Sequence, residues 1–376
     1  MRLLLINSEY SPIGGGAGNA TAHIAQRLAD MGHETIVVTS RFGNLPHCEQ
    51  SANLTVHRIP SLRRRQDRSG ALEQILFVLS ASFWTSGLIL RTRPDATLAF
   101  FGAPSGMVAI LLKKLFNIPY VISLRGGDVP GFRPYDFKKY HRILAPFLHI
   151  IWKNASSVVA NSKGLHDLAR AFDSRFEIPI IPNGVDLNLY STTERGEQSP
   201  VILSVGRLVY QKGFDLGIQA LAGLKHLDWH WQIAGDGPEM DALRSLVNQH
   251  GLTDRVTFRG WQSREQLIQC YKQANIFLFP SRHEGMPNAV LEAMASGLPV
   301  IASRIAGNEE LVVQEKTGFL VEEENINSLQ VALHELLENP TLRKSMGAAS
   351  RRRVEEFYTW ENTARQYAYL LEKASR

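Results

Sequence analysis

The segment IFLFPSRHEGMPNAVLEAMASGLPVIA, residues 276–302, decides the fold of the chain. It begins with an apolar strand pattern at residues 276–280, passes through a polar loop into a helical pattern, and ends in a second strand pattern at residues 300–302. Neither strand alternates between apolar and polar residues, which is typical of strands buried on both faces of a parallel sheet. A strand, a crossover helix and a second strand form the repeating unit of layered α/β folds.

The same alternation of strands and helices extends outward from this segment. We expect a helix at residues 19–31 and further strands at residues 2–7, 35–39, 96–101, 120–123, 157–160, 178–181, 201–205, 229–234 and 256–259. The alternation pauses at residues 191–200, which carry no large apolar side chain and indicate a linker or a surface loop. The sequence therefore predicts an α/β protein with two doubly wound domains of similar size.

Composition excludes several classes of protein. The 376 residues are 44% hydrophobic and 20% charged, the proportions of a folded globular protein. Two cysteines, Cys48 and Cys270, exclude a disulfide framework and a cysteine-built metal centre, and they fit a reducing compartment. The longest apolar run, residues 75–90, carries four hydroxyl residues and is shorter than the ~20 residues of a spanning helix. We therefore expect no transmembrane helix, and residues 3–6 are too few for a signal-peptide core.

Positive charge gathers in the first half of the chain. Residues 1–195 hold 22 Lys and Arg against 14 Asp and Glu, a net charge of +8, whereas residues 196–376 hold 19 against 22, a net charge of −3. The overall charge of +5 is too mild for a dedicated nucleic-acid binder, and the arginine cluster at residues 63–68 has no interleaved aromatic residue. Residues 72–93, 108–116 and 142–153 combine apolar and basic side chains, which indicates either core helices with solvated ends or docking on an anionic membrane.

A glycine-rich loop, residues 14–18, lies between the first predicted strand and the first helix. Glycines permit close backbone approach, and a helix N-terminus offers N–H groups to an anion. The spacing of a dinucleotide fingerprint fails, because Asn19 and Thr21 stand where it requires glycine and no acidic residue follows the second strand. The Walker A phosphate-binding pattern is also missing. A glycine turn needed only for tight packing remains the alternative.

A second loop, GRLVYQKG at residues 206–213, again follows a strand and precedes a helix. Arg207 offers a planar fork of donors and Lys212 a point charge, so the two side chains could converge on a diphosphate. Ligands of open α/β sheets bind beyond the carboxyl ends of the strands, which is where this loop lies. Two solvated side chains near a turn remain the alternative.

The opening segment carries two glutamates eight residues apart, Glu284 in the loop and Glu292 in the following helix. Pro287 falls near the first turn of that helix, where proline is favoured, and the N–H groups of residues 286–289 face the strand end, ready for phosphate. A carboxylate accepts hydrogen bonds from paired sugar hydroxyls. One glutamate could therefore hold a ribose and the other a hexose, or the pair could be a capping carboxylate and an exposed helix residue.

These motifs occur in a recognisable order: the glycine-rich loop, IPNGVD at residues 181–186, VGRLVYQKG at residues 205–213, AGDGPE at residues 234–239, and the glutamate pair. This combination resembles the family 4 glycosyltransferases, retaining enzymes of the GT-B fold, and among them the transferases of bacterial surface polysaccharide and lipopolysaccharide synthesis. The resemblance implies two Rossmann-like domains facing across a cleft. Residues 1–190 would bind the acceptor and residues 201–357 the nucleotide-sugar donor, while a final helix, residues 358–376, would pack back on the first domain.

The resemblance also implies roles for single residues. Arg207 and Lys212 would contact the donor diphosphate, Glu292 the ribose and Glu284 the transferred sugar. The full donor-binding set that it implies is Gly15, Gly16, Gly206, Arg207, Lys212, Glu284, Gly285, Met286, Pro287, Asn288 and Glu292. The implied mechanism is front-side attack, in which the leaving phosphate takes the acceptor proton and the protein stabilises the developing charge. We expect no cofactor and no metal ion beyond the UDP- or GDP-linked sugar, because two cationic side chains already face the diphosphate.

One segment departs from the family pattern. Where many members carry a histidine near the reacting sugar, this chain reads LRGGD at residues 124–128. Arg125 could supply charge to the transition state and Asp128 could face the acceptor hydroxyl, or either could simply form an ion pair.

The function expected from the resemblance is transfer of a hexose to a glycan or lipid-linked acceptor in surface polysaccharide synthesis. The reaction would take place in the cytoplasm or on the inner face of the cytoplasmic membrane, without nucleic acid. The alternative is a GT-B protein that binds a sugar nucleotide, or an epimerase, without transfer activity.

Overall fold

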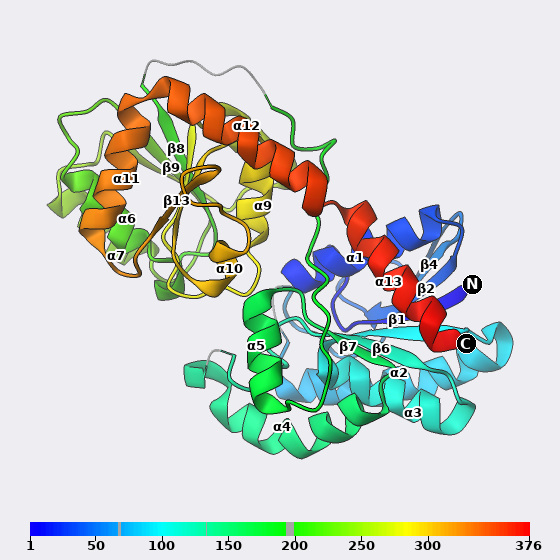
Figure 1. Cartoon of the computed structure of the whole chain (residues 1–376). Helices are drawn as coiled ribbons and strands as arrows, with labels where there is room; N and C mark the ends of the chain where they lie inside the picture. The colour runs from blue at the N-terminus through cyan, green and yellow to red at the C-terminus, as the bar shows by residue number, and fades with distance from the viewer. Residues whose placement is uncertain (67–68, 133, 193–198) are drawn as a thin grey trace. The chain divides into compact units, whose positions relative to one another are not determined.

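Two mainly parallel sheets form the frame of the chain (Figure 1). The computed structural model describes residues 1–66, 69–132, 134–192 and 199–376, and the side chains of residues 134–139 fall outside the description. The described residues divide into two compact units, unit 1 with Met1–Gly184 and Trp360–Arg376, and unit 2 with Val185–Thr359. Most of the predicted linker at residues 191–200 lies outside the described residues.

The sheet of unit 1 has the strand order β3-β4-β2-β1-β5-β6-β7. Neighbouring strands are parallel except β3, which is antiparallel to β4 at one edge. Strands β5 and β6 are buried along their whole length, as their unbroken apolar patterns predict. The strands are β1 (Arg2–Ile6), β2 (Glu34–Ser40), β3 (Cys48–Ser51), β4 (Leu54–Ile59), β5 (Ala96–Phe100), β6 (Tyr120–Ser123) and β7 (Ser157–Val159).

Helices cover both faces of this sheet. Figure 1 shows α1 and α13 over one face and α2, α3 and α4 over the other, which is the arrangement that right-handed crossovers from these strands require. The helical segments of unit 1 are α1 (Gly16–Asp30), α2 (Ala71–Thr92), the π-helical turn η1 (Phe101–Ser105), α3 (Gly106–Phe116), α4 (Pro134–Asn154), α5 (Lys163–Phe172) and α13 (Trp360–Ser375).

The last helix, α13, belongs to unit 1 although it ends the chain. Trp360 stacks on His23 of α1 with 4.8 Å between the ring centroids. Tyr367 is fully buried, and its hydroxyl lies 2.7 Å from Oγ of Ser123 at the end of β6. The expected return of the final helix to the first domain is therefore confirmed.

The sheet of unit 2 has the order β10-β9-β8-β11-β12-β13, with every neighbouring pair parallel. Its strands are β8 (Val201–Val205), β9 (His230–Ala234), β10 (Val256–Gly260), β11 (Ile276–Phe279), β12 (Val300–Ser303) and β13 (Gly318–Val321). Its helical segments are η2 (Tyr210–Lys212), α6 (Phe214–Ala222), α7 (Met240–Gln249), α8 (Arg264–Gln273), α9 (Asn288–Ala295), α10 (Ala306–Glu309), α11 (Ile326–Glu338) and α12 (Pro340–Phe357).

Each sheet has one point where the strand order reverses direction. In unit 1 this point lies between β1 and β5, and in unit 2 between β8 and β11. The loops that leave such neighbouring strands diverge to opposite faces and open a crevice between them, where ligands of this architecture bind. The predicted doubly wound α/β fold is confirmed for both units. A ligand site is expected at the reversal point of each sheet.

The structure corrects some sequence-based element boundaries. Residues 178–181 form only a single bridge, between Ala160 and Ile180, because Pro179 cannot donate to a ladder. The short strands β3, β4 and β13 were not predicted. The compact units divide between Gly184 and Val185, ahead of the predicted domain end at residue 190, because Val185 and Tyr190 are buried in a core cluster of unit 2.

Candidate active site

The two loops at the reversal point of unit 2 are joined by an ion pair. Lys212, at the end of η2, donates from Nζ to Oε1 of Glu284 over 2.7 Å. The side chains are 18% and 11% exposed, so the pair is mostly but not wholly shielded from water. The ion pair thus joins two residues that are 72 positions apart and that the sequence analysis identified in separate motifs.

Arg282 holds these two loops together. Its Nη1 and Nη2 donate to the two carboxylate oxygens of Asp215 over 2.9 and 2.7 Å, and its Nε donates to Glu324 over 2.6 Å. The guanidinium also lies 3.9 Å from the ring centroid of Tyr210, and the two carboxylates raise the pKa of Arg282. The bidentate contact with Asp215 and the single contact with Glu324 fix the loop geometry. The sequence did not single out Arg282, because its partners come from distant segments.

Glycine is required where the loops cross. Gly213 has φ of +64°, and a Cβ there would lie 2.0 Å from the carbonyl oxygen of Pro280. A Cβ on Gly206 would lie 3.3 Å from Cε of Lys212, so the lysine stem folds over this glycine. Glycine at both positions therefore lets the β8 loop, the β11 loop and the lysine pack in one small volume.

Glu292 lies on α9 and is held by tyrosines. The hydroxyl of Tyr271 donates to Oε2 of Glu292 over 2.9 Å, and the hydroxyl of Tyr190 is a second partner. Burial raises the pKa of Glu292, and the two hydroxyls only partly offset this effect. A carboxylate accepts about four hydrogen bonds, so capacity remains for a ligand. Tyr190 and Tyr271 were missed by sequence reasoning, since they reach Glu292 from outside its own helix.

The remaining donor-side residues border the same loops. Arg207 stands two residues after the end of β8 and is exposed. Its backbone carbonyl accepts from the N–H of Val209 over 2.9 Å, whereas its side chain has no hydrogen bond or ion pair among the described residues. Gly285 and Met286 precede α9, which begins at Asn288 with Pro287 as its N-cap residue. Pro287 therefore stands one position before the helix, and its carbonyl accepts from the N–H of Val290 over 3.1 Å.

In unit 1 the glycine-rich loop leads into α1. Gly15 is the N-cap residue and Gly16 the first residue of the helix. Gly14 has φ of +84°, a conformation that favours glycine. A Cβ on Gly15 would meet no atom within 4 Å, so close packing inside the fold does not explain glycine at this position.

Arg125 and Asp128 occupy the loop after β6, but their side chains do not form an ion pair with each other. Nη1 of Arg125 donates to Oδ1 of Asn183 over 2.6 Å, and its guanidinium lies 5.0 Å from the ring centroid of Phe100. Nε and Nη2 of Arg125 are shielded from solvent and have no hydrogen-bond partner among the described residues. Desolvation lowers the pKa of Arg125. Two buried donors without partners mark a place where a ligand could accept.

Asp128 instead organises the backbone around it. Its Oδ2 accepts from the N–H of Gly102 over 2.7 Å, and its Oδ1 accepts from the N–H groups of Arg125 and Gly126 over 3.0 and 3.1 Å. Burial raises the pKa of Asp128 against these hydrogen bonds. The carboxylate ties the β5 loop to the β6 loop.

A cavity of about 340 Å³ lies beside Asp128 at the reversal point of unit 1. Its walls come from the ends of β1 and β5, the start of α2 and the loop after β6. The lining residues are Ser8, Glu9, Ser69, Ala71, Gln74, Phe101, Ala103, Pro104, Gly127, Asp128 and Tyr140. Hydroxyl, amide and carboxylate groups together with an aromatic ring suit a polar, hydroxyl-rich molecule.

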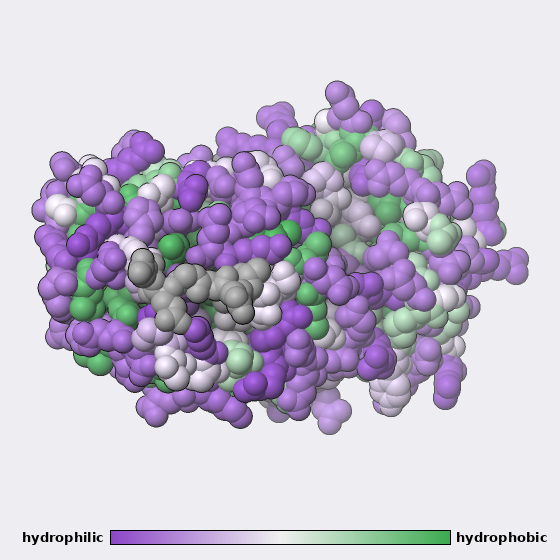
Figure 2. All heavy atoms as spheres, turned by 90° about the horizontal axis from the view of Figure 1, so that it is seen from above, coloured by the Kyte–Doolittle hydropathy of each residue, from purple (hydrophilic) through white to green (hydrophobic). Residues whose placement is uncertain are grey.

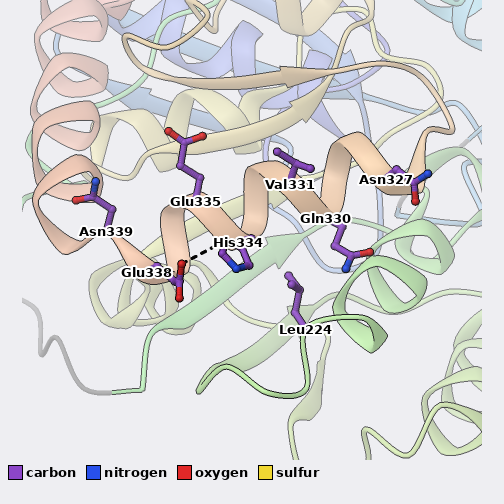
Figure 3. A pocket seen from close by; sticks show the side chains of 8 residues that line it. All are labelled: Leu224, Asn327, Gln330, Val331, His334, Glu335, Glu338 and Asn339. Carbon is purple, nitrogen blue, oxygen red and sulfur yellow. Dashed lines mark ion pairs between the residues drawn. The ribbon is translucent and has the colours of Figure 1, made fainter.

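A larger hollow of about 780 Å³ lies elsewhere in unit 2 (Figure 3). It follows the outer side of α11, where His334 pairs with Glu338 over 3.4 Å, and Leu224 closes it from the opposite side. None of the residues predicted for the donor lines it, so size alone does not identify the site. Among the described residues, no cluster of three or more His, Cys, Asp or Glu side chains could hold a metal ion.

Comparison with known proteins adds the family. Residues 191–353 match the family described as Glycosyl transferases group 1, and residues 14–189 match Glycosyltransferase Family 4. The lipopolysaccharide core biosynthesis glycosyltransferase LpsE of Rhizobium meliloti is 25% identical over 363 residues, which cover 95% of this chain and 96% of LpsE.

Solved structures agree over almost the whole chain. Sucrose-phosphate synthase from Thermosynechococcus elongatus has a TM-score of 0.86 at 24% identity, covering 99% of this chain and 98% of that one. Anabaena HepE, solved in complex with UDP and glucose, has a TM-score of 0.78 at 21% identity, covering 99% of this chain and 100% of that one. The two family matches together span both units and contain all the motifs above. The chain therefore belongs to the group 1/family 4 glycosyltransferases, retaining, nucleotide-sugar-dependent enzymes of the GT-B fold.

Proposed function

We propose that this glycosyltransferase moves a hexose from a UDP- or GDP-linked sugar to a glycan or lipid-linked acceptor in the synthesis of a surface polysaccharide. The observation that carries the donor half of this proposal is the contact between Lys212 and Glu284 at the reversal point of unit 2. A cation and a hydrogen-bond acceptor held 2.7 Å apart match a diphosphate and its attached sugar, which are themselves adjacent groups.

The donor takes over this ion pair when it binds. Its diphosphate replaces Glu284 as the partner of Lys212, and the released carboxylate accepts from a hydroxyl of the hexose. Arg207, which is exposed in the same loop as Lys212, adds a second cationic contact to the diphosphate. Residues 285–288 border the diphosphate on the other side.

Glu292 holds the ribose in this proposal. Tyr190 and Tyr271 fix the carboxylate and leave part of its accepting capacity for the paired ribose hydroxyls. UDP is supported by the HepE complex with UDP and glucose, although that structure is distant in sequence. A GDP-linked donor remains the second choice in the experiment below.

The acceptor occupies the cavity beside Asp128. Its lining is mostly apolar, with a few polar groups and aromatic rings that can hold a sugar, and its position at the reversal point of unit 1 is where this fold binds ligands. Arg125 contributes its two unpartnered donors to the charge that develops during transfer. Asp128 acts through the backbone that it organises, since its oxygens already accept three N–H groups.

The reaction proceeds by front-side attack. The acceptor oxygen bonds to the anomeric carbon on the face that the diphosphate leaves, and the departing phosphate oxygen takes the acceptor proton. The cationic side chains Arg207 and Lys212 stabilise the diphosphate charge, so we expect transfer to continue when a chelator removes divalent ions. The relative LpsE supports a role in cell-surface glycan synthesis, and we place that reaction on the cytoplasmic side of the membrane.

A panel of nucleotide sugars tests the donor assignment. UDP- and GDP-linked hexoses are added singly, and the melting temperature is measured. A donor that binds the folded chain raises the melting temperature by mass action. At a concentration 100-fold above Kd, it adds about 2.7 kcal/mol to the free energy of unfolding. We expect one nucleotide series to stabilise the wild type and to stabilise Arg207→Ala much less. Arg352→Ala, which removes an exposed arginine elsewhere in unit 2, is the matched control.

Transfer itself needs a second measurement. With the stabilising donor and a mixture of glycan and lipid-linked acceptors, release of the nucleoside diphosphate should depend on acceptor. Binding without any release would favour a sugar-nucleotide-binding protein, and conversion of the donor sugar without release would favour an epimerase. If no nucleotide sugar stabilises the wild type, the donor assignment is wrong.

A further inference from the structure

Helix α2 is apolar on both of its faces. Its buried face, Phe77, Ala81, Thr85 and Ile89, lies against the sheet of unit 1. The opposite face should be polar if it met only water. Instead it carries large apolar side chains that are between 57% and 86% exposed, namely Leu72, Ile75, Leu79, Phe83 and Leu90. These positions recur at helical spacing, so they form one continuous stripe along the helix.

The neighbouring helices extend this stripe. Helix α3 packs against both α2 and α4, and all three cover the same face of the sheet (Figure 1). Leu115 of α3 is exposed, and so are Ile143, Phe147 and Ile150 of α4. We call these four residues and the α2 stripe together the apolar layer. Among the described residues, nine of the sixteen most exposed large hydrophobic side chains belong to it.

Basic side chains border the apolar layer. Arg91 and Arg93 lie at the carboxyl end of α2, Lys114 near the end of α3, and Arg142 and Lys153 at positions that flank the exposed residues of α4. All five are exposed. Glu73 is the acidic residue within α2, and its carboxylate already accepts hydrogen bonds from the N–H groups of Gly70 and Arg64. The layer is therefore apolar in its middle and positive at its rim.

Another face of the molecule shows the ordinary pattern. Figure 2 shows the face seen from above, where hydrophilic side chains dominate and hydrophobic ones are scattered. Scattered exposed apolar residues are normal on a protein surface, whereas a contiguous apolar patch with a polar rim marks a binding surface. The apolar layer has the composition of such a binding surface, with large apolar side chains gathered on three neighbouring helices.

We propose that the apolar layer docks unit 1 on an anionic lipid bilayer, with α2, α3 and α4 lying in the plane of the interface. The positive rim matches anionic headgroups, and the apolar middle enters the boundary of the acyl chains. A second copy of this chain fits less well, because a face-to-face pair would bring two positive rims together.

Helix α2 lies on the membrane in this proposal and does not cross it. The sequence predicted no spanning helix, yet α2 is 22 residues long with a mean hydropathy of 1.5, enough by length and composition to cross a membrane, and 22% of that window is buried. Crossing would pull Phe77 and Ile89 out of the core of unit 1. Lying flat keeps that core intact and buries the stripe as well.

The membrane and the proposed acceptor cavity are then neighbours. Ala71 and Gln74, at the start of α2, line the cavity, and the stripe begins at Leu72. A bilayer on the apolar layer would thus reach the cavity mouth, which suits an acceptor whose lipid stays in the membrane. This last step rests on the proposed function, whereas the docking itself does not depend on catalysis.

Vesicle sedimentation tests the docking. The full chain is mixed with vesicles of phosphatidylglycerol and phosphatidylcholine in equal parts, or of phosphatidylcholine alone, and the bound fraction is measured. We expect binding to the anionic vesicles that weakens as salt is added. Leu79→Glu/Phe83→Glu should lower the partition coefficient at least ~10-fold, since two acidic groups replace buried apolar ones at the interface. Arg142→Glu/Lys153→Glu should also lower binding and remove most of the salt dependence.

Val331→Glu is the matched control, because it changes an exposed apolar residue of unit 2 and should bind vesicles as the wild type does. Each variant should keep the wild-type melting temperature and its stabilisation by donor, which shows that the fold and donor site are intact. Failure of the wild type to bind anionic vesicles, or full binding by Leu79→Glu/Phe83→Glu, overturns the proposal. A dimer in light scattering that the same variant abolishes, without vesicle binding, assigns the layer to a second copy instead. Vesicle binding without sugar transfer would leave the docking standing and refute the proposed function alone.

Discussion

Replacing Lys212 by methionine separates its contribution to stability from its contribution to transfer. Methionine keeps most of the stem that packs over Gly206 and removes only the charge, which lies 4.8 Å from the ring centroid of Phe279. Glu284 then stays shielded without its cation. Breaking a fully buried pair costs about 3–5 kcal/mol and breaking an exposed one about 0–1 kcal/mol. At 18% and 11% exposure the Lys212 pair lies between them, and we expect a loss of about 2 kcal/mol.

For a unit of this size, a loss of 2 kcal/mol corresponds to a fall in melting temperature of about 4–8 °C. Transfer should fall at least ~100-fold, the scale of losing one charge-stabilising donor in a transition state. Adding Glu284→Gln to Lys212→Met removes the unpaired carboxylate. The double variant should therefore regain most of the lost stability while its transfer rate stays low.

Melting curves and acceptor-dependent release of the nucleoside diphosphate measure the two effects on the same samples. Lys163→Met is the control, because the Lys163–Asp167 pair is 70% and 54% exposed and its loss should change stability by less than ~0.5 kcal/mol. Near-normal transfer by Lys212→Met would refute the role of the lysine at the diphosphate. Recovery of transfer in the double variant would show instead that the pair acts only by holding the loops.

Three further changes test other parts of the site. Glu292→Gln should leave the melting temperature equal or higher at pH 7, because the raised pKa of this carboxyl group means that its ionisation opposes folding. The Kd for the donor should nevertheless rise in this variant. In the wild type, the affinity for the donor should begin to fall on acidification while the pH is still above 4.5, the ordinary pKa of a glutamate. Gly213→Ala should cost well over the ~1–2 kcal/mol of Gly260→Ala, since both have similar positive φ but only the first places its Cβ against Pro280; equal melting temperatures would contradict this packing argument. Asp128→Asn should lower stability by about 1–3 kcal/mol, because an amide nitrogen replaces one accepting oxygen, and an unchanged melting curve would refute the anchoring role.

Local sequence was enough to locate the two loops that we propose bind the donor. Strands β8 and β11 are short, apolar and unbroken, and each is followed by glycines and charged residues, so their carboxyl ends could be recognised one at a time. The parallel order of the sheet then brings those ends to one edge. By contrast, Arg282 and Tyr271 look like ordinary loop and helix residues, because their partners Asp215 and Glu292 come from other segments.

Contacts in unit 1 also could not be predicted from local sequence. From the sequence, Arg125 and Asp128 could serve the transition state and the acceptor, or could form an ion pair. In the structure Asp128 accepts from backbone N–H groups, and Arg125 donates to Asn183. Asn183 lies in the IPNGVD motif, but nothing in its spacing indicates that it reaches the loop after β6. Contacts between loops depend on where the sheet places their ends.

The sequence by itself determined the α/β class, the two sets of parallel strands, the family and the motifs that we propose for the donor, because buried strands and glycine-bounded loops leave local patterns in the chain. Only the tertiary structure decided that Lys212 meets Glu284, and that one face of α2 remains exposed. The sequence does not distinguish an apolar residue that becomes buried in a core from one that stays exposed on a surface. Which of them is buried is decided by the neighbours that the fold packs against each face.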